Sequence, residues 1–137
     1  MDAIAEFDAA TDDGGSAAHA AHSALYYASV AEFVGEYLAD LFHRRYAANE
    51  RESEFQWCAQ WWRHPEAVSR LDALWLAWEQ MRLEGGTAMS AWWRDYADPT
   101  MRALFQSNGT FEGCTPDRHA PKGRALPVVQ PPAGLFD

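Results

Sequence analysis

Apolar residues recur at helical spacing between residues 27 and 46. They follow one another at intervals of three and four residues, which places them on one face of an α-helix: Val30, Phe33, Val34, Tyr37, Leu38, Leu41 and Phe42. The acidic residues of this stretch fall off that face. His43, Arg44 and Arg45 close the last turn, where positive charge suits the helix dipole. The pattern predicts an amphipathic helix over Tyr27–Tyr46.

Two further helices are predicted on either side of Pro65. A shorter one covers about Glu52–Arg63, with Phe55, Cys58, Trp61 and Trp62 close to one side. It ends before Pro65, because the residue preceding a proline avoids the helical region. Proline is tolerated in a first turn, so the next helix begins there and runs to about Leu83. Its apolar stripe is Val68, Leu71, Leu74, Trp75, Trp78 and Met81, and Gly85 and Gly86 supply its cap.

The remaining apolar pattern predicts one longer and one short helix. Thr87 begins a helix that continues through Met89, Trp92, Trp93 and Tyr96. Asp98 and Pro99 suit the N-cap and first position of a last helix over residues 100–105. No stretch alternates apolar and polar residues over a useful length. The predicted fold class is therefore all-α, a small bundle of four to five helices.

Composition sets the expected domain limits. Residues 1–22 carry five acids and no Lys or Arg, which predicts a disordered acidic arm. The helical domain is expected over residues 23–119. From Thr115 onward prolines dominate, so residues 120–137 are predicted to form an extended Pro-rich tail. The chain has seven tryptophans, and because each can bury roughly 150–250 Å², they are expected to form much of the core.

Net charge and the N-terminal sequence narrow the function classes. The net charge of −9 disfavours binding to phosphate backbones, so a nucleic-acid partner is not expected. No apolar run approaches the 18 residues that a membrane span needs. The N-terminus is acidic where a secretory signal is basic, which predicts a cytoplasmic location. In a reducing cytosol, two cysteines are expected to be free or metal-bound.

The strongest candidate chemistry is a set of two cysteines and two histidines. Cys58 precedes His64 in WCAQWWRH, and Cys114 precedes His119 in GCTPDRH. Two thiolates and two imidazoles would complete a tetrahedral zinc site, and the spacing of Cys114 and His119 suits a structural half-site. On one continuous helix, residues six apart point about 240° from each other, so His64 must turn back after Arg63. His43 is a substitute fourth ligand.

Two other interpretations of the cysteines remain open from spacing alone. In one, Cys58 is a small apolar core residue, His64 caps the next helix and Cys114 is loose. In the other, Cys58 and Cys114 form a disulfide, which would require export. His64, Glu66 and Arg70 also cluster at a helix start. We expect Glu66 to be an acid in the first turn of the helix that forms a surface ion pair with Arg70. A catalytic pair of His64 and a carboxylate is the less favoured interpretation.

Three segments resemble a known family: WCAQWWRHPEAVSRLDALWLAWEQMR, MSAWWRDYADPTMRALF and GTFEGCTPDRH. They are similar to an actinobacterial domain of unknown function, number 4913. The resemblance implies a small protein carried on plasmids, integrative elements or phages, and it transfers no catalytic residue. It also implies that Cys58, His64, Cys114 and His119 belong to the family's motifs. This chain has Tyr96 where the family pattern has His, and Thr110 where it has Pro.

Three functional hypotheses follow. The leading one is a non-enzymatic helical adaptor of an actinobacterial mobile element, with a structural zinc site and a protein partner. The alternative is a zinc-dependent hydrolase in which three of the four Cys and His residues bind zinc and Glu66 acts as general base. The third is a nucleic-acid-associated protein that uses Arg44, Arg45, Arg63 and Arg70.

Overall fold

The computed structural model describes residues 24–48 and 55–137. The predicted acidic arm, and the start of the helix predicted over Glu52–Arg63, lie outside the described residues. Across the described ranges the secondary structure is helical, with no strand; one isolated bridge pairs Thr115 with Arg118. The predicted all-α class is therefore confirmed.

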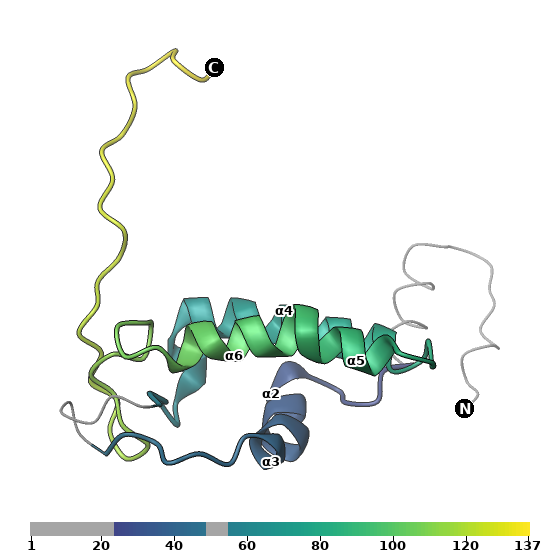
Figure 1. Cartoon of the computed structure of the whole chain (residues 1–137). Coiled ribbons are helices and arrows are strands. Elements are labelled where there is room, and N and C mark those ends of the chain that lie inside the picture. Colours follow the sequence, from purple (N-terminus) through teal and green to yellow (C-terminus); the bar gives the residue numbers. More distant parts are fainter. Residues whose placement is uncertain (1–23, 49–54) are drawn as a thin grey trace.

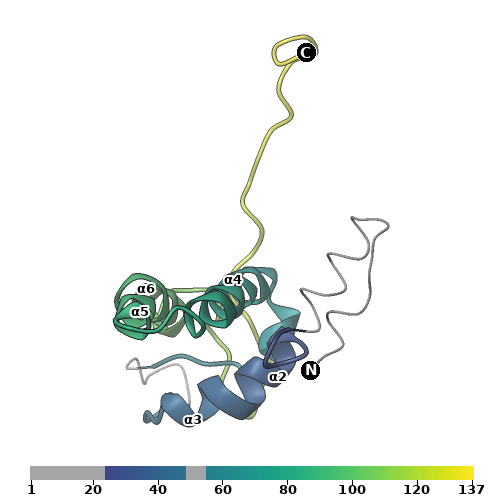
Figure 2. The ribbon, with the colours of Figure 1, turned by 90° about the vertical axis from the view of Figure 1, so that its right-hand side faces the viewer.

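The helical segments join end to end into three rods. Figure 1 shows the second and third rods running side by side above the first, and Figure 2 shows the same layers from the end. The first rod comprises α2 (Val30–Phe33), the π-helical turn η2 (Val34–Leu38) and α3 (Ala39–Leu41). The second is α4 (Pro65–Met81), preceded by the 3-10 turn η3 (Trp61–Arg63). The third comprises α5 (Ala88–Trp92), the π-helical turn η4 (Trp93–Ala97) and α6 (Asp98–Phe105).

The first rod is shorter at both ends than the predicted Tyr27–Tyr46. It begins after Ser29, whose hydroxyl accepts a hydrogen bond from the backbone N–H of Glu32. The Glu32 carboxylate in turn accepts one from the N–H of Ala28 at 2.8 Å, so local side chains satisfy the helix start. The helix ends at Leu41, and the Tyr46 hydroxyl then donates to the carbonyl of Phe42.

The third rod passes through Pro99, where two helices were predicted. Pro99 has no N–H to donate, which normally ends or kinks a helix. Here a π-helical turn precedes it, and the N–H of Asp98 donates to Trp93 five residues back. The chain therefore stays helical from Ala88 to Phe105, and the predicted boundary at Asp98–Pro99 is wrong.

The helix predicted over Glu52–Arg63 is also wrong in its described part. Residues 55–58 are not helical, and only η3 follows them. The N–H of Gln56 donates to Phe105 at 3.1 Å, and the N–H of Ala47 donates to Phe55 at 2.8 Å. The first bond ties the segment to the end of α6, and the second ties it to the chain after α3. The described residues therefore form three rods, where four to five helices were predicted.

The core lies between the three rods. Helix α4 contacts α2, α5 and α6, and the largest fully buried side chains of the rods are Trp92, Phe33, Leu71, Leu74 and Leu104. Trp75 and Trp78 are also buried, so three of the seven tryptophans form the expected indole centre. Trp62, predicted to share an apolar side with Cys58, is 60% exposed because its helix does not form.

Glu79 on α4 is a buried carboxylate that no pattern in the sequence had indicated. Its oxygens accept hydrogen bonds from the N–H groups of Tyr26 and Tyr27 at 2.8 and 2.9 Å, and from the Trp75 indole at 3.0 Å. Arg82 adds an ion pair at 3.0 Å. The carboxylate therefore fastens the segment before α2 onto α4.

The C-terminal segment departs from this body. Residues 121–137 are all exposed, and Figures 1 and 2 both show them extending away from the rods. In the part of the chain that the structure describes, no helix has both the length and the apolar content that crossing a membrane requires.

Candidate metal centre

Cys58 and His64 reach one point because the chain between them is a turn. Residues 59 and 60 form a turn, η3 follows, and His64 adopts an extended conformation with φ −110° and ψ 107° before α4 begins at Pro65. A continuous helix would have pointed the two side chains apart. The proline that limits the conformation of His64 thus contributes to the return of its imidazole toward Cys58.

Cys114 and His119 flank a tight turn. The backbone groups of Thr115 and Arg118 exchange hydrogen bonds at 2.9 and 3.1 Å, which brings the residues on either side together. The turn is itself held to the loop before it, since the N–H of Lys122 donates to Glu112 at 2.9 Å. The turn formed by the four residues between Cys114 and His119 therefore lets both side chains reach the same metal ion.

The four ligand atoms converge, all lying within 4.8 Å of one another. The Cys58 Sγ lies 3.3 Å from the His119 Nδ1, and the Cys114 Sγ lies 3.7 Å from the His64 Nε2 and 3.9 Å from the His119 Nδ1. Atoms about 2.0–2.3 Å from a tetrahedral ion would stand about 3.3–3.8 Å apart. The cluster thus has the dimensions of a four-coordinate metal site.

Burial sets the protonation of the metal-free cluster. Cys58, His64 and Cys114 are buried, and His119 is partly buried. Burial raises the pKa of the Cys58 thiol to about 11, and the neighbouring Cys114 adds to the rise. Burial also lowers the pKa of His64, as does the charge of His119, so His64 is held in the neutral form that a metal needs. A bound cation would favour the Cys58 thiolate and oppose the effect of burial.

Neighbouring residues orient the His64 ring. Its Nδ1 lies 3.4 Å from the Thr110 hydroxyl, which leaves Nε2 facing Cys114. The ring packs edge-on against Phe111, with the two ring centres 4.8 Å apart. The ring centres of Phe111 and Trp57 lie 4.9 Å apart. Metal-binding histidines usually hold their second nitrogen in such a hydrogen bond. Thr110 thus takes part in the surroundings of the cluster.

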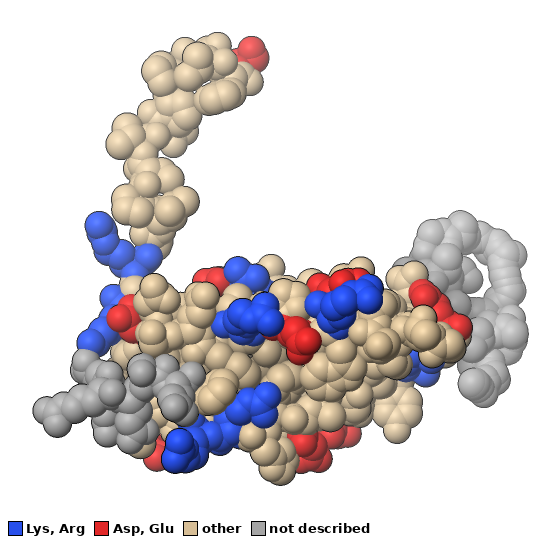
Figure 3. Space-filling model, viewed as in Figure 1, with Lys and Arg blue, Asp and Glu red and all other residues tan. Residues whose placement is uncertain are grey.

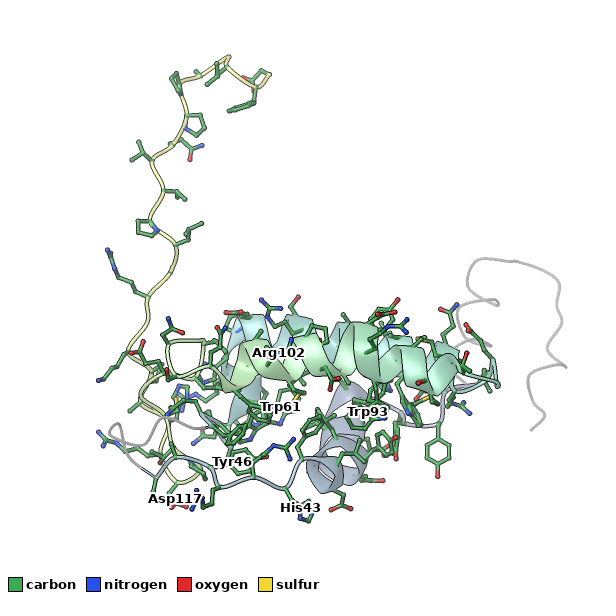
Figure 4. The ribbon with its side chains drawn as sticks, viewed as in Figure 1. His43, Tyr46, Trp61, Trp93, Arg102 and Asp117 are labelled. Atoms are coloured by element: carbon green, nitrogen blue, oxygen red, sulfur yellow. The ribbon has the colours of Figure 1, made fainter. Side chains whose placement is uncertain are left out.

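Other candidates from the sequence lie outside the cluster. His43, the substitute ligand, is exposed on the segment after α3, as Figure 4 shows. Glu66 pairs with Arg70 at 2.9 Å, with both side chains about half exposed. Tyr96 is 44% exposed. Both cysteines are free thiols, so the disulfide alternative does not match the structure.

Gly113 is the position where the loop tolerates least change. Its φ is +94°, and an added Cβ would clash with the carbonyl oxygen of Ala120. We expect Gly113→Ala to weaken metal binding by about 5- to 150-fold, because roughly 1–3 kcal/mol of strain would displace Cys114. Competition titration with a chromophoric chelator measures this. Gly123→Ala is the matched control, since nothing lies within 4 Å of its added Cβ; equal affinities would contradict the prediction.

Comparison with known proteins gives one match. The sequence model of a family described as Domain of unknown function (DUF4913) matches residues 27–132, which include all four residues of the cluster. Neither the curated proteins nor the solved structures gave a match.

Proposed function

Because this chain belongs to the DUF4913 family, whose description assigns no activity, we propose its function from the site itself. The chain is a non-enzymatic helical adaptor that binds a structural zinc ion through Cys58, His64, Cys114 and His119. The observation that carries this proposal is the convergence of four ligand atoms, two sulfurs and two imidazole nitrogens, within 4.8 Å.

The ligand types favour zinc among the common metals. Calcium and magnesium prefer oxygen ligands, and the cluster offers none. Two thiolates and two imidazoles in a four-coordinate arrangement are typical of structural zinc. Because three of the four side chains are buried, the ion would be largely shielded from exchange with solvent.

The number of ligands supports a structural role over hydrolysis. A catalytic zinc ion usually keeps one position open for water, with three protein ligands. Here four side chains would fill the tetrahedron. Glu66, the general base of the hydrolase hypothesis, is paired with Arg70 on the surface and is not a member of the cluster.

Zinc would fasten the C-terminal loop to the rods. The cluster joins a segment just before α4 to a loop some 50 residues later, as the separation of Cys114 and His64 shows. Structural zinc can contribute on the order of 10 kcal/mol, comparable to the whole stability of a domain. The loop would then hold the exposed tail in a fixed position for a partner.

The partner we propose is a protein. It would belong to the machinery of an actinobacterial mobile element, acting in the cytoplasm, as the family resemblance implies. The described surface supports binding by apolar contacts, because three large apolar side chains are exposed on and beside α4: Trp62, Leu76 and Leu83.

Affinity capture from the native host tests the adaptor proposal. We expect the tagged full chain to retain one reproducible host or element protein, at least about tenfold more than Cys114→Ser retains. Glu66→Ala is the matched control and should retain the partner as the wild type does. Failure of the wild-type chain to retain any protein, or loss of retention in Glu66→Ala alone, would contradict the proposal.

A further inference from the structure

An open apolar groove runs between the first rod, the segment before α4 and the end of α6. One part, of about 300 Å³, is lined by apolar and aromatic residues that include Leu38, Tyr46, Trp57 and Trp61. A second part, of about 380 Å³, shares Phe42, Met101 and Phe105 with the first, so the two lie next to each other. In Figure 4, Trp61 lies below α6, and Tyr46 lies on the segment that follows the first rod.

The groove has a basic end. Arg44 and Arg102 line its second part, together with the single acid Asp98. Arg44 lies 5.5 Å from the centres of the Phe42 and Phe55 rings, so its charge sits beside aromatic surface. Figure 3 shows Lys and Arg side chains on this face, over α6 and below it. A segment that fits here would be apolar and extended, with an acid at one end.

The tail of this same chain has those properties. Residues 125–136 read ALPVVQPPAGLF, with Asp137 after them, and contain no charged side chain. Leu126, Val128 and Val129 are 79–92% exposed. Three prolines restrict residues 125–132 to extended conformations before a turn at residues 133–135, and extended Pro-rich segments bind aromatic-lined grooves at low entropic cost. The family match also runs through residue 132, so most of the tail belongs to the matched region.

The direction of the tail favours another molecule over its own groove. The N–H of Lys122 is bonded to Glu112, and Ala120 packs against Gly113, which fixes where the tail leaves the loop. From that point it extends away from the rods in both views (Figures 1 and 2). Reciprocal exchange between two copies would bury two tails, which brings the contact toward the roughly 1,200–2,000 Å² of a specific complex.

We propose that two copies of this chain form a dimer by exchanging tails, residues 125–136 of each lying in the aromatic groove of the other. Asp137 then lies near Arg44 and Arg102 of the receiving copy. None of the four residues of the metal cluster lines the groove or lies within residues 125–136, so the groove and the tail can each be altered without replacing a metal ligand.

Gly35 gives a way to block the groove without disturbing the fold. It lines the groove, and an added Cβ would meet nothing within 4 Å. A larger side chain there would occupy the space of the tail, and replacing a helical glycine does not weaken the helix. Ala31→Leu is the matched control, because Ala31 is exposed on the same rod and does not line the groove.

Light scattering of the full chain over a range of concentrations measures the dimer. We expect twice the mass of one 15.4 kDa chain, and an at least tenfold weaker dimer in Gly35→Leu and in the double variant Val128→Asp, Val129→Asp. Ala31→Leu should match the wild type. A mixture of the two weakened variants should form a heterodimer that is tighter than either variant alone and weaker than the wild type, because only one of the two tails then meets an intact groove.

Each other outcome overturns the proposal in a distinct way. A monomer whose tail is protected from proteolysis by the groove, and released in Gly35→Leu, would mean that the tail binds its own copy. A monomer with an equally cleavable tail in all variants would mean that the groove takes no tail. A dimer unaffected by both variants would mean a different interface.

Discussion

Loss of the zinc ion is expected to lower the melting temperature of the full chain by at least about 15 °C. A structural zinc site contributes on the order of 10 kcal/mol, and each 1 kcal/mol corresponds to roughly 2–8 °C in domains of this size range. The loop after α6 depends on the site most, since Cys114 and His119 both come from it. Differential scanning calorimetry with and without a chelator measures the effect.

A pair of histidine variants separates the metal from ordinary packing. His119→Ala should melt at a much lower temperature than the wild type in zinc, whereas His43→Ala should not, because His43 is exposed outside the cluster. In excess chelator the difference between His119→Ala and the wild type should nearly disappear. If the same difference persists in chelator, His119 stabilises the fold by packing and the zinc account is wrong.

Replacement of Glu79 should produce the second large effect. The alanine variant removes the acceptor of four hydrogen-bonding groups and leaves Arg82 without its ion-pair partner, so we expect a loss of about 3–5 kcal/mol. Glu66→Ala is the matched control on the same helix. Its exposed pair with Arg70 should contribute less than about 1 kcal/mol. Urea unfolding followed by circular dichroism measures both.

The contribution of Glu79 should also depend on pH. Burial by itself raises the pKa of this carboxyl, but the N–H groups of Tyr27 and Tyr26, with Arg82 and Trp75, outweigh it and lower the pKa below 4.5. Because the folded pKa is depressed, the stabilisation is fully present above the unfolded pKa and is lost as pH falls through the folded value.

The pH test compares wild type with Glu79→Gln, so that any metal effect common to both cancels. The stability difference between them should be constant near neutral pH and shrink below about pH 4.5. A difference that grows as the pH falls would contradict the assigned role of the carboxylate.

Periodicity predicted the helices whose positions are decided by local sequence. The stripe of α4 is spaced at three and four residues, the helix begins at Pro65 as predicted, and its end at Met81 is two residues before the predicted Leu83. The C-cap is Arg82, so the predicted cap at Gly85 and Gly86 is wrong. The prediction failed where long-range contacts decide the backbone. Residues 55–58 have aromatic spacing that fits a helix, but the N–H of Gln56 bonds to Phe105, far along the chain.

Pro99 shows a second limit of the sequence rules. A proline normally ends a helix, yet the π-helical turn η4 lets the third rod continue through it. Glu79 shows a third limit. Its partners Tyr26 and Tyr27 lie more than 50 residues away, so nothing in its own neighbourhood predicts that it is buried.

The four-residue site was predictable because ligand chemistry needs few residue types. The sequence has two cysteines, and each precedes a histidine by a short interval. The spacing of the residues did not predict the turn between Cys58 and His64. A helix there would have pointed the two side chains apart. The contact between the Thr110 hydroxyl and the His64 Nδ1, and the packing of Phe111, could not be predicted either, because they depend on how the loop returns to α4.

X-ray absorption at the zinc edge, with metal content measured on the same purified full chain, would establish whether Cys58, His64, Cys114 and His119 hold zinc. We expect one zinc ion per chain, with two sulfur neighbours at about 2.3 Å, two nitrogen neighbours at about 2.0 Å and no oxygen. A chain that purifies without metal and melts at the same temperature in chelator, or a zinc ion with three protein ligands and a water, would contradict the proposed zinc site.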